Sequence, residues 1–467
     1  MKGRIILLAS AGAAFVIVIT LAFLLVKPEF PKPVSHKLPT PALNLSNSTK
    51  ESVSPAILAS DSNVYVAWVE AGWNSSDVYF RKSSDNGMNF DKPIILSASY
   101  GAPINGLEIS QDGSNLYLTW YQGLGGRGAS IHLASSYDHG NTFLRTAVKN
   151  VSNEILWPMK LASANDSVYI MWAEANTTSG EESSAYSIFL ARSVDKGNSI
   201  AEIKPLQTNA GPSEFRDIVA KGNNVYVLWH STGPNREHRI FFEKSSDNGK
   251  TFGEALRLDR NKSLQLHYAT NGNLALSGNF VYAIWNLGSE STNLAQYVIS
   301  SDSGNTFGSP ITIDPTQRIF YPSISALAND VYILWETGTP NGDPAESDVY
   351  FIHSTDNGRT FTEASNLSND TLNNSYPVMS VAESRIAIVW LGWENNITRG
   401  GWDGTTDTYL TSSSDGGFTF SAPSKISSEL DHRAISAGVA GSIQRFYIIW
   451  SDQDGQKKDI FLTVNDE

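Results

Sequence analysis

An eight-residue turn recurs along the chain and constrains its fold more than any other feature. It reads Ser-x-Asp-x-Gly-x-Thr-Phe; the first copy ends Asn89-Phe90, the third ends Ser199-Ile200, and the others keep Thr-Phe. The carboxylate can accept backbone N–H groups later in the turn, and the glycine supplies a positive φ. The aspartates of the seven copies are Asp85, Asp138, Asp195, Asp247, Asp302, Asp356 and Asp415. Their spacing of 52 to 59 residues predicts a propeller or a solenoid built from repeats.

A second motif, a short β-branched and aromatic run ending in tryptophan, recurs in phase with the turn. One copy reads Val331-Tyr-Ile-Leu-Trp335. Because the run has no helical period, it predicts a strand that is buried on both faces. We interpret the tryptophans as core residues. They are Trp68, Trp120, Trp172, Trp229, Trp285, Trp335, Trp390 and Trp450.

Each repeat accommodates four strands. Around Trp335, a first strand begins near Pro322, a third covers Asp348–His353 and leads into the turn, and a fourth covers Asn366–Ser368. Four-stranded antiparallel units of this length predict an all-β fold, an eight-bladed β-propeller. A seven-bladed propeller is the alternative if one unit is irregular.

The last repeat ends before its fourth strand, and the missing strand has a counterpart at the other end of the chain. The segment Leu43–Ser46 resembles Asn366–Ser368 and precedes the first repeat. We therefore expect residues 42–46 to complete the last blade, which removes an exposed sheet edge.

The N-terminal region differs in composition from the repeats. Ile5–Val26 carries no charge, follows Lys2 and Arg4, and is long enough to cross a bilayer as a helix. We predict a transmembrane signal anchor over residues 1–27, with a cleaved signal peptide as the alternative. Prolines stiffen a stalk over residues 28–41, and residues 42–467 form the propeller. The protein is then a single-pass membrane protein with its propeller outside the cytoplasm.

The charge of the chain and its lack of cysteine exclude several functions. A net charge of −13 argues against nucleic acid and against an anionic membrane surface as partners. Without cysteine there is neither a disulfide nor thiolate chemistry. The histidines lack metal-ligand spacing and no cofactor motif is present, so we predict neither a metal nor a cofactor.

Through the repeated turn, the chain resembles the Asp-box, or bacterial-neuraminidase-repeat, propellers, which include sialidases. The resemblance covers residues 42–467 and implies that the turn is a structural element at the blade periphery. Sialidases of this group have six blades, a Phe/Tyr-Arg-Ile-Pro motif, an arginine triad and a Tyr–Glu nucleophile with an Asp acid/base. Here the nearest match to the motif is Phe215-Arg216-Asp217-Ile218, which lies in the fourth repeat and has no following proline. The resemblance therefore implies the architecture rather than the reaction.

Strand alternation predicts that a binding site lies on the face opposite the Asp turns. The connections from second to third strands vary in length on that face, as binding loops do. The connection after Trp390 carries Trp393 and Trp402, which either stack on sugar rings or pin the loop to the body.

The first strands should begin around a central channel on the same face. An alignment of the repeats on their tryptophans places these residues at the channel mouth: Ser54, Asn105, Trp157, Phe215, Asn271, Tyr321, Tyr376 and His432. The next positions include Arg216 and Arg433. We expect the aromatic residues to bind a ligand, or else to pack neighbouring blades. Arg216, Arg433 and Glu336 are the candidate catalytic residues; Glu70 and Glu174 also follow second strands.

Three functions follow from this reading. The first is a membrane-anchored module that binds a glycan or a protein partner. The second is a sialidase-like exo-glycosidase. The third is a structural element of the cell envelope.

Overall fold

The structure, a computed structural model, has strands joined by turns and loops, and no helix, in the residues that it describes. It describes residues 41–72, 76–97, 102–124, 128–153, 155–175, 186–206, 213–232, 238–259, 272–288, 293–314, 316–338, 347–394, 397–398, 401–402, 406–427, 432–454 and 457–466. These residues belong to one unit, Lys37–Glu467. Within these ranges there is no helix that is long and apolar enough to cross a membrane. The predicted anchor and nearly all of the predicted stalk lie outside them.

Six sheets have four antiparallel strands each, in chain order. The first three are β2 (Glu51–Ser60), β3 (Asn63–Ala71), β4 (Ser76–Ser83), β5 (Ile94–Ile95); β6 (Ile104–Asp112), β7 (Asn115–Gly123), β8 (Ala129–Ser136), β9 (Leu144–Val151); and β10 (Ile155–Ala164), β11 (Ser167–Ala175), β12 (Tyr186–Ser193), β13 (Glu202–Pro205). The next three are β14 (Ser213–Lys221), β15 (Asn224–Thr232), β16 (His238–Ser245), β17 (Leu256–Arg257); β18 (Gly272–Ser277), β19 (Phe280–Gly288), β20 (Asn293–Ser300), β21 (Ile311–Thr312); and β22 (Arg318–Leu327), β23 (Asp330–Gly338), β24 (Val349–Ser354), β25 (Ser365–Asn366).

The remaining repeat strands form one eight-stranded sheet that divides into two groups of four. One group is β26 (Asn373–Ala382), β27 (Arg385–Trp393), β30 (Thr406–Ser413) and β31 (Ser424–Lys425). The other is β32 (His432–Gly441), β33 (Phe446–Asp454), β34 (Lys457–Asn465) and β1 (Leu43–Asn44). A single parallel pair, Thr406 with Arg433, joins the groups. A small hairpin of β28 (Ile397–Thr398) and β29 (Gly401–Trp402) lies in the connection between β27 and β30.

The tryptophan strands are the buried second strands of these units, as predicted. In β23 the six residues Val331–Glu336 are all buried. The eight repeat tryptophans are at most 2% exposed. Each lies in a core cluster formed between consecutive groups of four strands, such as the cluster that joins Tyr332 and Leu334 to Trp390. Burying one such aromatic side chain removes a large apolar area from water, which makes these clusters the main stabilising contacts.

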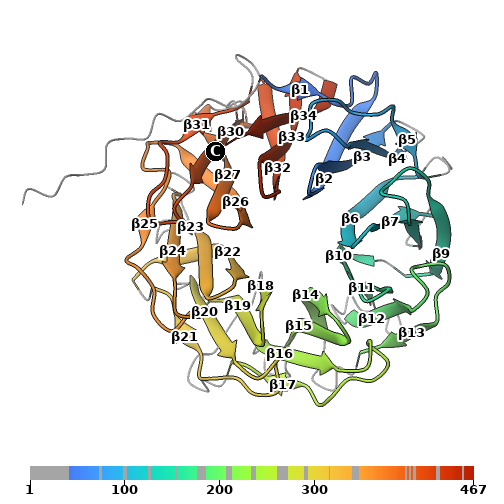
Figure 1. The fold of residues 1–467 in the computed structure, drawn as a ribbon, viewed down its shortest axis with the longest axis horizontal. Coiled ribbons are helices and arrows are strands. Elements are labelled where there is room, and N and C mark those ends of the chain that lie inside the picture. The colour runs from blue at the N-terminus through green and yellow to red at the C-terminus, as the bar shows by residue number, and fades with distance from the viewer. Residues whose placement is uncertain are drawn as a thin grey trace, which may run out of the picture. The chain divides into compact units, whose positions relative to one another are not determined.

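The groups of four strands follow one another around a ring (Figure 1). Each first strand contacts the first strand of the next group, and β32 contacts β2. A core cluster joins the first and last groups of strands, with Leu45 and Trp68 packed against Tyr447 and Leu462. Small antiparallel sheets arranged in this way define a β-propeller-type fold.

The segment predicted to complete the last repeat does so. β1 pairs antiparallel with β34, with Leu43 opposite Leu462 and Asn44 opposite Phe461. The amide of Leu45 then donates to the carbonyl of Ile460 at 2.7 Å. The prediction that the N-terminal strand closes the last sheet is confirmed.

The recurrent turns begin at the last residue of each third strand and use their carboxylates entirely within the turn. In one of them, Ser300 Oγ donates to Asp302 Oδ1 at 2.7 Å, and Thr306 donates its amide to Oδ1 and its hydroxyl to Oδ2. Hydrogen bonds from Thr306 and Ser300 lower the pKa of Asp302 to about 2. The Gly304 amide donates to Ser300 Oγ, and the glycine has a φ of 79°. The turn aspartate is therefore a structural residue.

Candidate ligand-binding site

Two tyrosines, Tyr321 and Tyr376, project from bulges in the first strands on the face opposite the turns. Pairing in β22 skips from Phe320 to Ser323, and in β26 from Ser375 to Val378, each opposite a repeat tryptophan. Both tyrosines precede proline and have positive φ, 46° and 56°. Positive φ is uncommon for residues other than glycine, and it turns the ring out of the strand's regular alternation.

The bulge does not require an aromatic side chain. In β2 the pairing skips from Val53 to Ala56, and Ser54 there has a φ of 53° before Pro55. The same backbone geometry thus accommodates a small polar residue. The tyrosine rings are therefore additions to the bulge rather than a condition for forming it.

The two tyrosine rings form an exposed pair across neighbouring repeats. Their centroids lie 5.2 Å apart with a 49° tilt. Tyr321 is 38% exposed and Tyr376 is 55% exposed. Burial, followed by the nearby Tyr376 and Glu336, raises the pKa of Tyr321 to about 12, so its hydroxyl stays protonated and can donate a hydrogen bond at neutral pH.

Glu336 lies beneath this pair and connects the two repeats. It is 8% exposed on β23, and its Oε2 accepts the backbone N–H of Tyr376 at 3.0 Å. Burial raises the pKa of Glu336 to about 7, although the Tyr376 amide and the Ser375 hydroxyl act in the opposite direction. A carboxyl group that titrates near neutral pH can act as an acid or a base, so Glu336 remains a candidate for such a role.

Tyr376 also lines a hollow of about 600 Å³ at the junction of the two groups in the eight-stranded sheet. We call it the junction hollow. Its lining residues are Tyr376, Leu391, Trp393, Thr406, Arg433, Ala434, Ile435, Gln453 and Lys458. The volume is within the usual range of small-molecule sites. All these residues lie at the beginnings of first or third strands or at the ends of second strands, which places them on the predicted face.

The two cationic side chains that line the junction hollow, Lys458 and Arg433, differ in whether they can bind a ligand. Lys458 Nζ lies 2.9 Å from Glu51 Oε2 and is neutralised by that ion pair. Arg433 is exposed, and no described residue forms an ion pair with it. An unpaired guanidinium beside aromatic rings can bind an acidic or strongly hydrogen-bonding group.

The structure brings together some of the predicted residues and not others. Tyr376, Trp393 and Arg433 line the junction hollow, and Tyr321 and Glu336 contact Tyr376. The side chains of five further candidates lie outside the described residues: Trp157, Phe215, Arg216, Trp402 and His432.

The strand register corrects one detail of the sequence alignment. The alignment gives Arg433 the same position in its repeat as Pro322, but Arg433 pairs with Gln453, three residues past Trp450. In β22 the residue at that level is Arg318, which pairs with Gly338. Arg318 and Arg433 both stand 17 residues before their tryptophan, whereas Pro322 stands 13 residues before Trp335. The position of the bulge also differs, since it lies opposite Trp335 in β22 and past Trp450 in β32. Arg318 does not line the junction hollow and instead lies over the Phe320 ring.

Two other carboxylates, Glu70 and Glu174, have structural partners. Trp68 Nε1 donates to Glu70 at 2.7 Å, and Trp172 Nε1 donates to Glu174 at 2.8 Å. Both stand two residues past their tryptophan, whereas Glu336 follows Trp335 directly and so faces the other side of its strand. This one-residue difference separates the available carboxyl group from the two structural ones.

Sequence reasoning missed Thr406, Gln453 and Lys458. They are polar residues at strand ends without a motif of their own. Their positions in the strands could have identified them. Each lies at the start of a third strand or the end of a second strand, on the face where Arg433 and Trp393 were expected.

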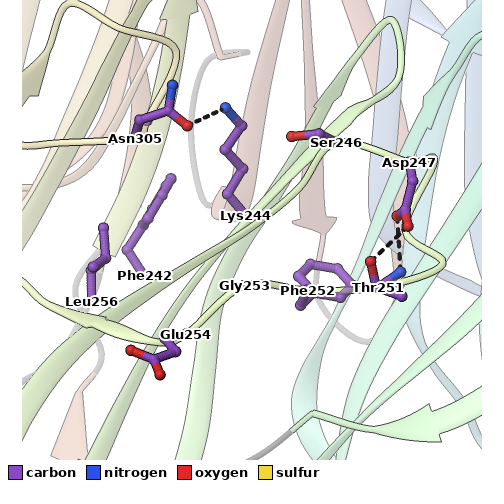
Figure 2. A pocket seen from close by; sticks show the side chains of 11 residues that line it. Phe242, Lys244, Ser246, Asp247, Thr251, Phe252, Gly253, Glu254, Leu256 and Asn305 are labelled. Atoms are coloured by element: carbon purple, nitrogen blue, oxygen red, sulfur yellow. Dashed lines mark hydrogen bonds between the residues drawn. The ribbon is translucent and has the colours of Figure 1, made fainter.

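A second hollow, of about 500 Å³, lies on the opposite face between the turns after β16 and β20. Figure 2 shows two pairs among its polar groups, with Lys244 Nζ donating to Asn305 at 2.9 Å and the Thr251 hydroxyl to Asp247 at 2.6 Å. Lys82 contacts Asn141 in the same way in an earlier pair of turns. This hollow is therefore a groove between repeats, closed by a recurring lysine contact, and not our candidate site.

The described residues contain no group of three or more His, Cys, Asp or Glu side chains that could hold a metal ion. The groups that line the junction hollow are two aromatic rings, a guanidinium, an ammonium, an amide and a hydroxyl, together with three apolar side chains.

Comparisons with known proteins give only distant likenesses. No protein-family model matches the chain, and no curated protein matches it. Among solved structures, a Hadza microbial sialidase has a TM-score of 0.41 at 13% identity, covering 70% of this chain and 74% of its own. A Trypanosoma rangeli sialidase in complex with sialic acid has a TM-score of 0.38 at 11% identity, covering 92% and 57%. The chain thus spans little more than half the length of that sialidase.

A polysaccharide lyase has a TM-score of 0.49 at 10% identity, covering 81% of this chain and 94% of its own. At these values the likenesses assign neither a reaction nor a ligand to this chain.

Proposed function

We propose that this protein is a membrane-anchored, eight-bladed propeller of the Asp-box group that binds a glycan at the junction hollow. The observation that carries the proposal is that Tyr376, Trp393 and Arg433 line one hollow of about 600 Å³. Carbohydrates are bound through aromatic faces and a few directed polar groups, and this hollow offers both. Arg433, which has no ion-pair partner among the described residues, favours a glycan that carries an acidic or densely hydroxylated unit.

The architecture in this proposal extends the fold described above. The eight tryptophan strands and the core clusters between consecutive groups support eight blades. Seven turns with the same Ser–Asp–Gly hydrogen bonding support the Asp-box assignment. The uncharged run Ile5–Val26 supports the anchor and hence an extracytoplasmic propeller.

Binding to a glycan array tests the proposed function. The full chain in detergent should bind at least one class of glycan, and Tyr376→Ala or Arg433→Ala should reduce that binding about tenfold or more. Tyr137→Ala is the matched control, because Tyr137 is also 38% exposed but lies in a turn on the opposite face. A protein that binds no glycan, or one whose binding is unchanged in both variants, would refute the proposal.

A second candidate function is a sialidase-like exo-glycosidase, favoured by the buried Glu336 next to Tyr321. Its pKa of about 7 suits an acid/base group, and sialidases of the resembling family use a tyrosine with a glutamate. Turnover of fluorogenic glycosides that is abolished by Glu336→Gln or Arg216→Ala would favour this function. A protein partner and a purely structural role in the envelope remain the outcomes if neither binding nor turnover is found.

A further inference from the structure

The two aromatic features of the site are joined through one residue. The ring of Tyr376 lines the junction hollow and also lies 5.2 Å from the ring of Tyr321 on the preceding repeat. Tyr321 itself is not among the residues that line the hollow. A ligand confined to the hollow would therefore leave Tyr321 unused.

The positions of these residues run along the ring of sheets. Tyr321, Tyr376 and Arg433 stand on β22, β26 and β32, the first strands of three consecutive groups, and each strand contacts the next. The surface that they form thus crosses two junctions between repeats. It extends sideways around the ring, from the tyrosine pair to the guanidinium of Arg433.

The backbone bulge does not require an aromatic ring at position 321. Ser54 shows that the bulge forms with a small side chain, and 38% of Tyr321 remains exposed. The hydroxyl of Tyr321 stays protonated, so the residue presents both an apolar ring face and a hydrogen-bond donor, as sugar-binding aromatic residues do.

We propose that the ligand is an internal stretch of an extended polysaccharide, bound across Tyr321, Tyr376 and the junction hollow, rather than a single terminal sugar. This inference rests on the proposed glycan-binding function. One sugar unit occupies the hollow beside Arg433 and Trp393, and a following unit lies against the tyrosine pair. Because each added unit gains a new aromatic contact without a second association cost, affinity rises with chain length until the surface is covered.

The chain-length dependence of binding tests this inference. The probes are galacturonate, cello- and manno-oligosaccharides of one to six units, titrated calorimetrically against the full chain in detergent. In the series that binds, we expect the tetrasaccharide to bind at least tenfold more tightly than the monosaccharide. Tyr321→Ala should remove about tenfold from tetrasaccharide affinity and leave monosaccharide affinity unchanged. Arg433→Ala should weaken both.

The outcomes separate this inference from the function on which it rests. Equal affinity for the monosaccharide and the tetrasaccharide, or an equal loss for both in Tyr321→Ala, would overturn the extended ligand while leaving glycan binding intact. If no series binds and the array is also blank, both are overturned. Tyr137→Ala controls for loss of an aromatic ring elsewhere, and a thermal melt of Tyr321→Ala verifies that the variant is folded.

Discussion

Asn44 Nδ2 donates to Asp459 Oδ2 at 3.0 Å, a contact between residues that are 415 positions apart in the chain. Asp459 also accepts the Ser46 hydroxyl at 2.9 Å, and Ser46 Oγ accepts the amide of Ile460. The same arrangement occurs locally in the sheet β22–β25, where Asp348 accepts Asn366 at 2.9 Å and Ser368 at 2.8 Å. The N-terminal segment thus reproduces a fourth strand bond by bond.

Removing the carboxylate of Asp459 should loosen the closure of the ring. Asp459→Ala leaves Asn44 and Ser46 without their acceptor, and each lost hydrogen bond of this kind costs about 1–3 kcal/mol. We expect a lower melting temperature and faster proteolytic cleavage just before residue 51. The measurements are a thermal melt and limited proteolysis with N-terminal sequencing.

Asp348→Ala is the matched control, because it removes the same bonds from a strand that is continuous with its own repeat. It should lower the melting temperature without exposing the N-terminal segment. If both variants release that segment equally, or if neither is destabilised, then the contact between Asn44 and Asp459 does not hold the ring closed.

Features that repeat could be predicted from the sequence. The strand burial, the tryptophan core and the closing segment all follow from comparing several copies of one local pattern, so an error in one copy is corrected by the others. The resemblance of Asn44–Ser46 to Asn366–Ser368 was sufficient because side chains in both places donate to an aspartate near the start of a third strand.

The candidate site could be predicted only in part, because it depends on what differs between repeats. The aromatic and charged positions Tyr321, Tyr376, Trp393 and Arg433 stood out by residue type. Their grouping did not, because the alignment put Arg433 at the position of Pro322, although Arg433 stands 17 residues before Trp450 and Pro322 only 13 before Trp335. Counting residues also cannot show where the bulge lies, which is opposite Trp335 in β22 but past Trp450 in β32. A shift of one residue reverses the face of a strand.

Adding a methyl group at Gly304 should be more destabilising than adding one at another glycine of positive φ. Gly304 has a φ of 79°, and a Cβ atom there would lie 2.9 Å from Phe242 Cζ of the preceding repeat. Gly278 has a φ of 57° and nothing within 4 Å of such an atom. Gly278→Ala should thus cost about 1 kcal/mol for backbone strain, and Gly304→Ala about 1–3 kcal/mol more for overpacking. Chemical denaturation of both variants measures this difference; equal losses would show that the turn does not pack tightly on its neighbour.

Glu174 should behave as a structural residue rather than a catalytic one. It is 7% exposed and accepts Trp172 Nε1 at 2.8 Å and Lys149 Nζ at 2.6 Å. Glu174→Ala leaves two donors without an acceptor, which should lower the free energy of unfolding by about 2–4 kcal/mol. Glycan binding at a temperature where the variant is folded should be unchanged. A loss of binding with no loss of stability would instead place Glu174 in the site.

Ionisation of Glu336 should make the protein less stable as the pH rises toward and above neutrality. Its ordinary pKa is 4.5, and burial raises it to about 7 in the folded protein. The folded state therefore binds this proton more tightly than the unfolded state, so the stabilisation is complete below the ordinary pKa and is lost as the pH rises through about 7.

Replacing Glu336 with glutamine removes this titration. It keeps an acceptor for the Tyr376 amide, because the side-chain carbonyl of glutamine accepts hydrogen bonds. We expect Glu336→Gln to be more stable than the unsubstituted protein at pH 8, by at most about 3 kcal/mol, with the advantage fading toward pH 5. Chemical denaturation at both values measures it, and Glu254→Gln, an exposed change on the opposite face, is the control. The stability of Glu336→Gln relative to the unsubstituted protein could instead be the same at pH 5 and pH 8. In that case the buried carboxyl group does not titrate between these values, and the proposed acid/base role of Glu336 is refuted.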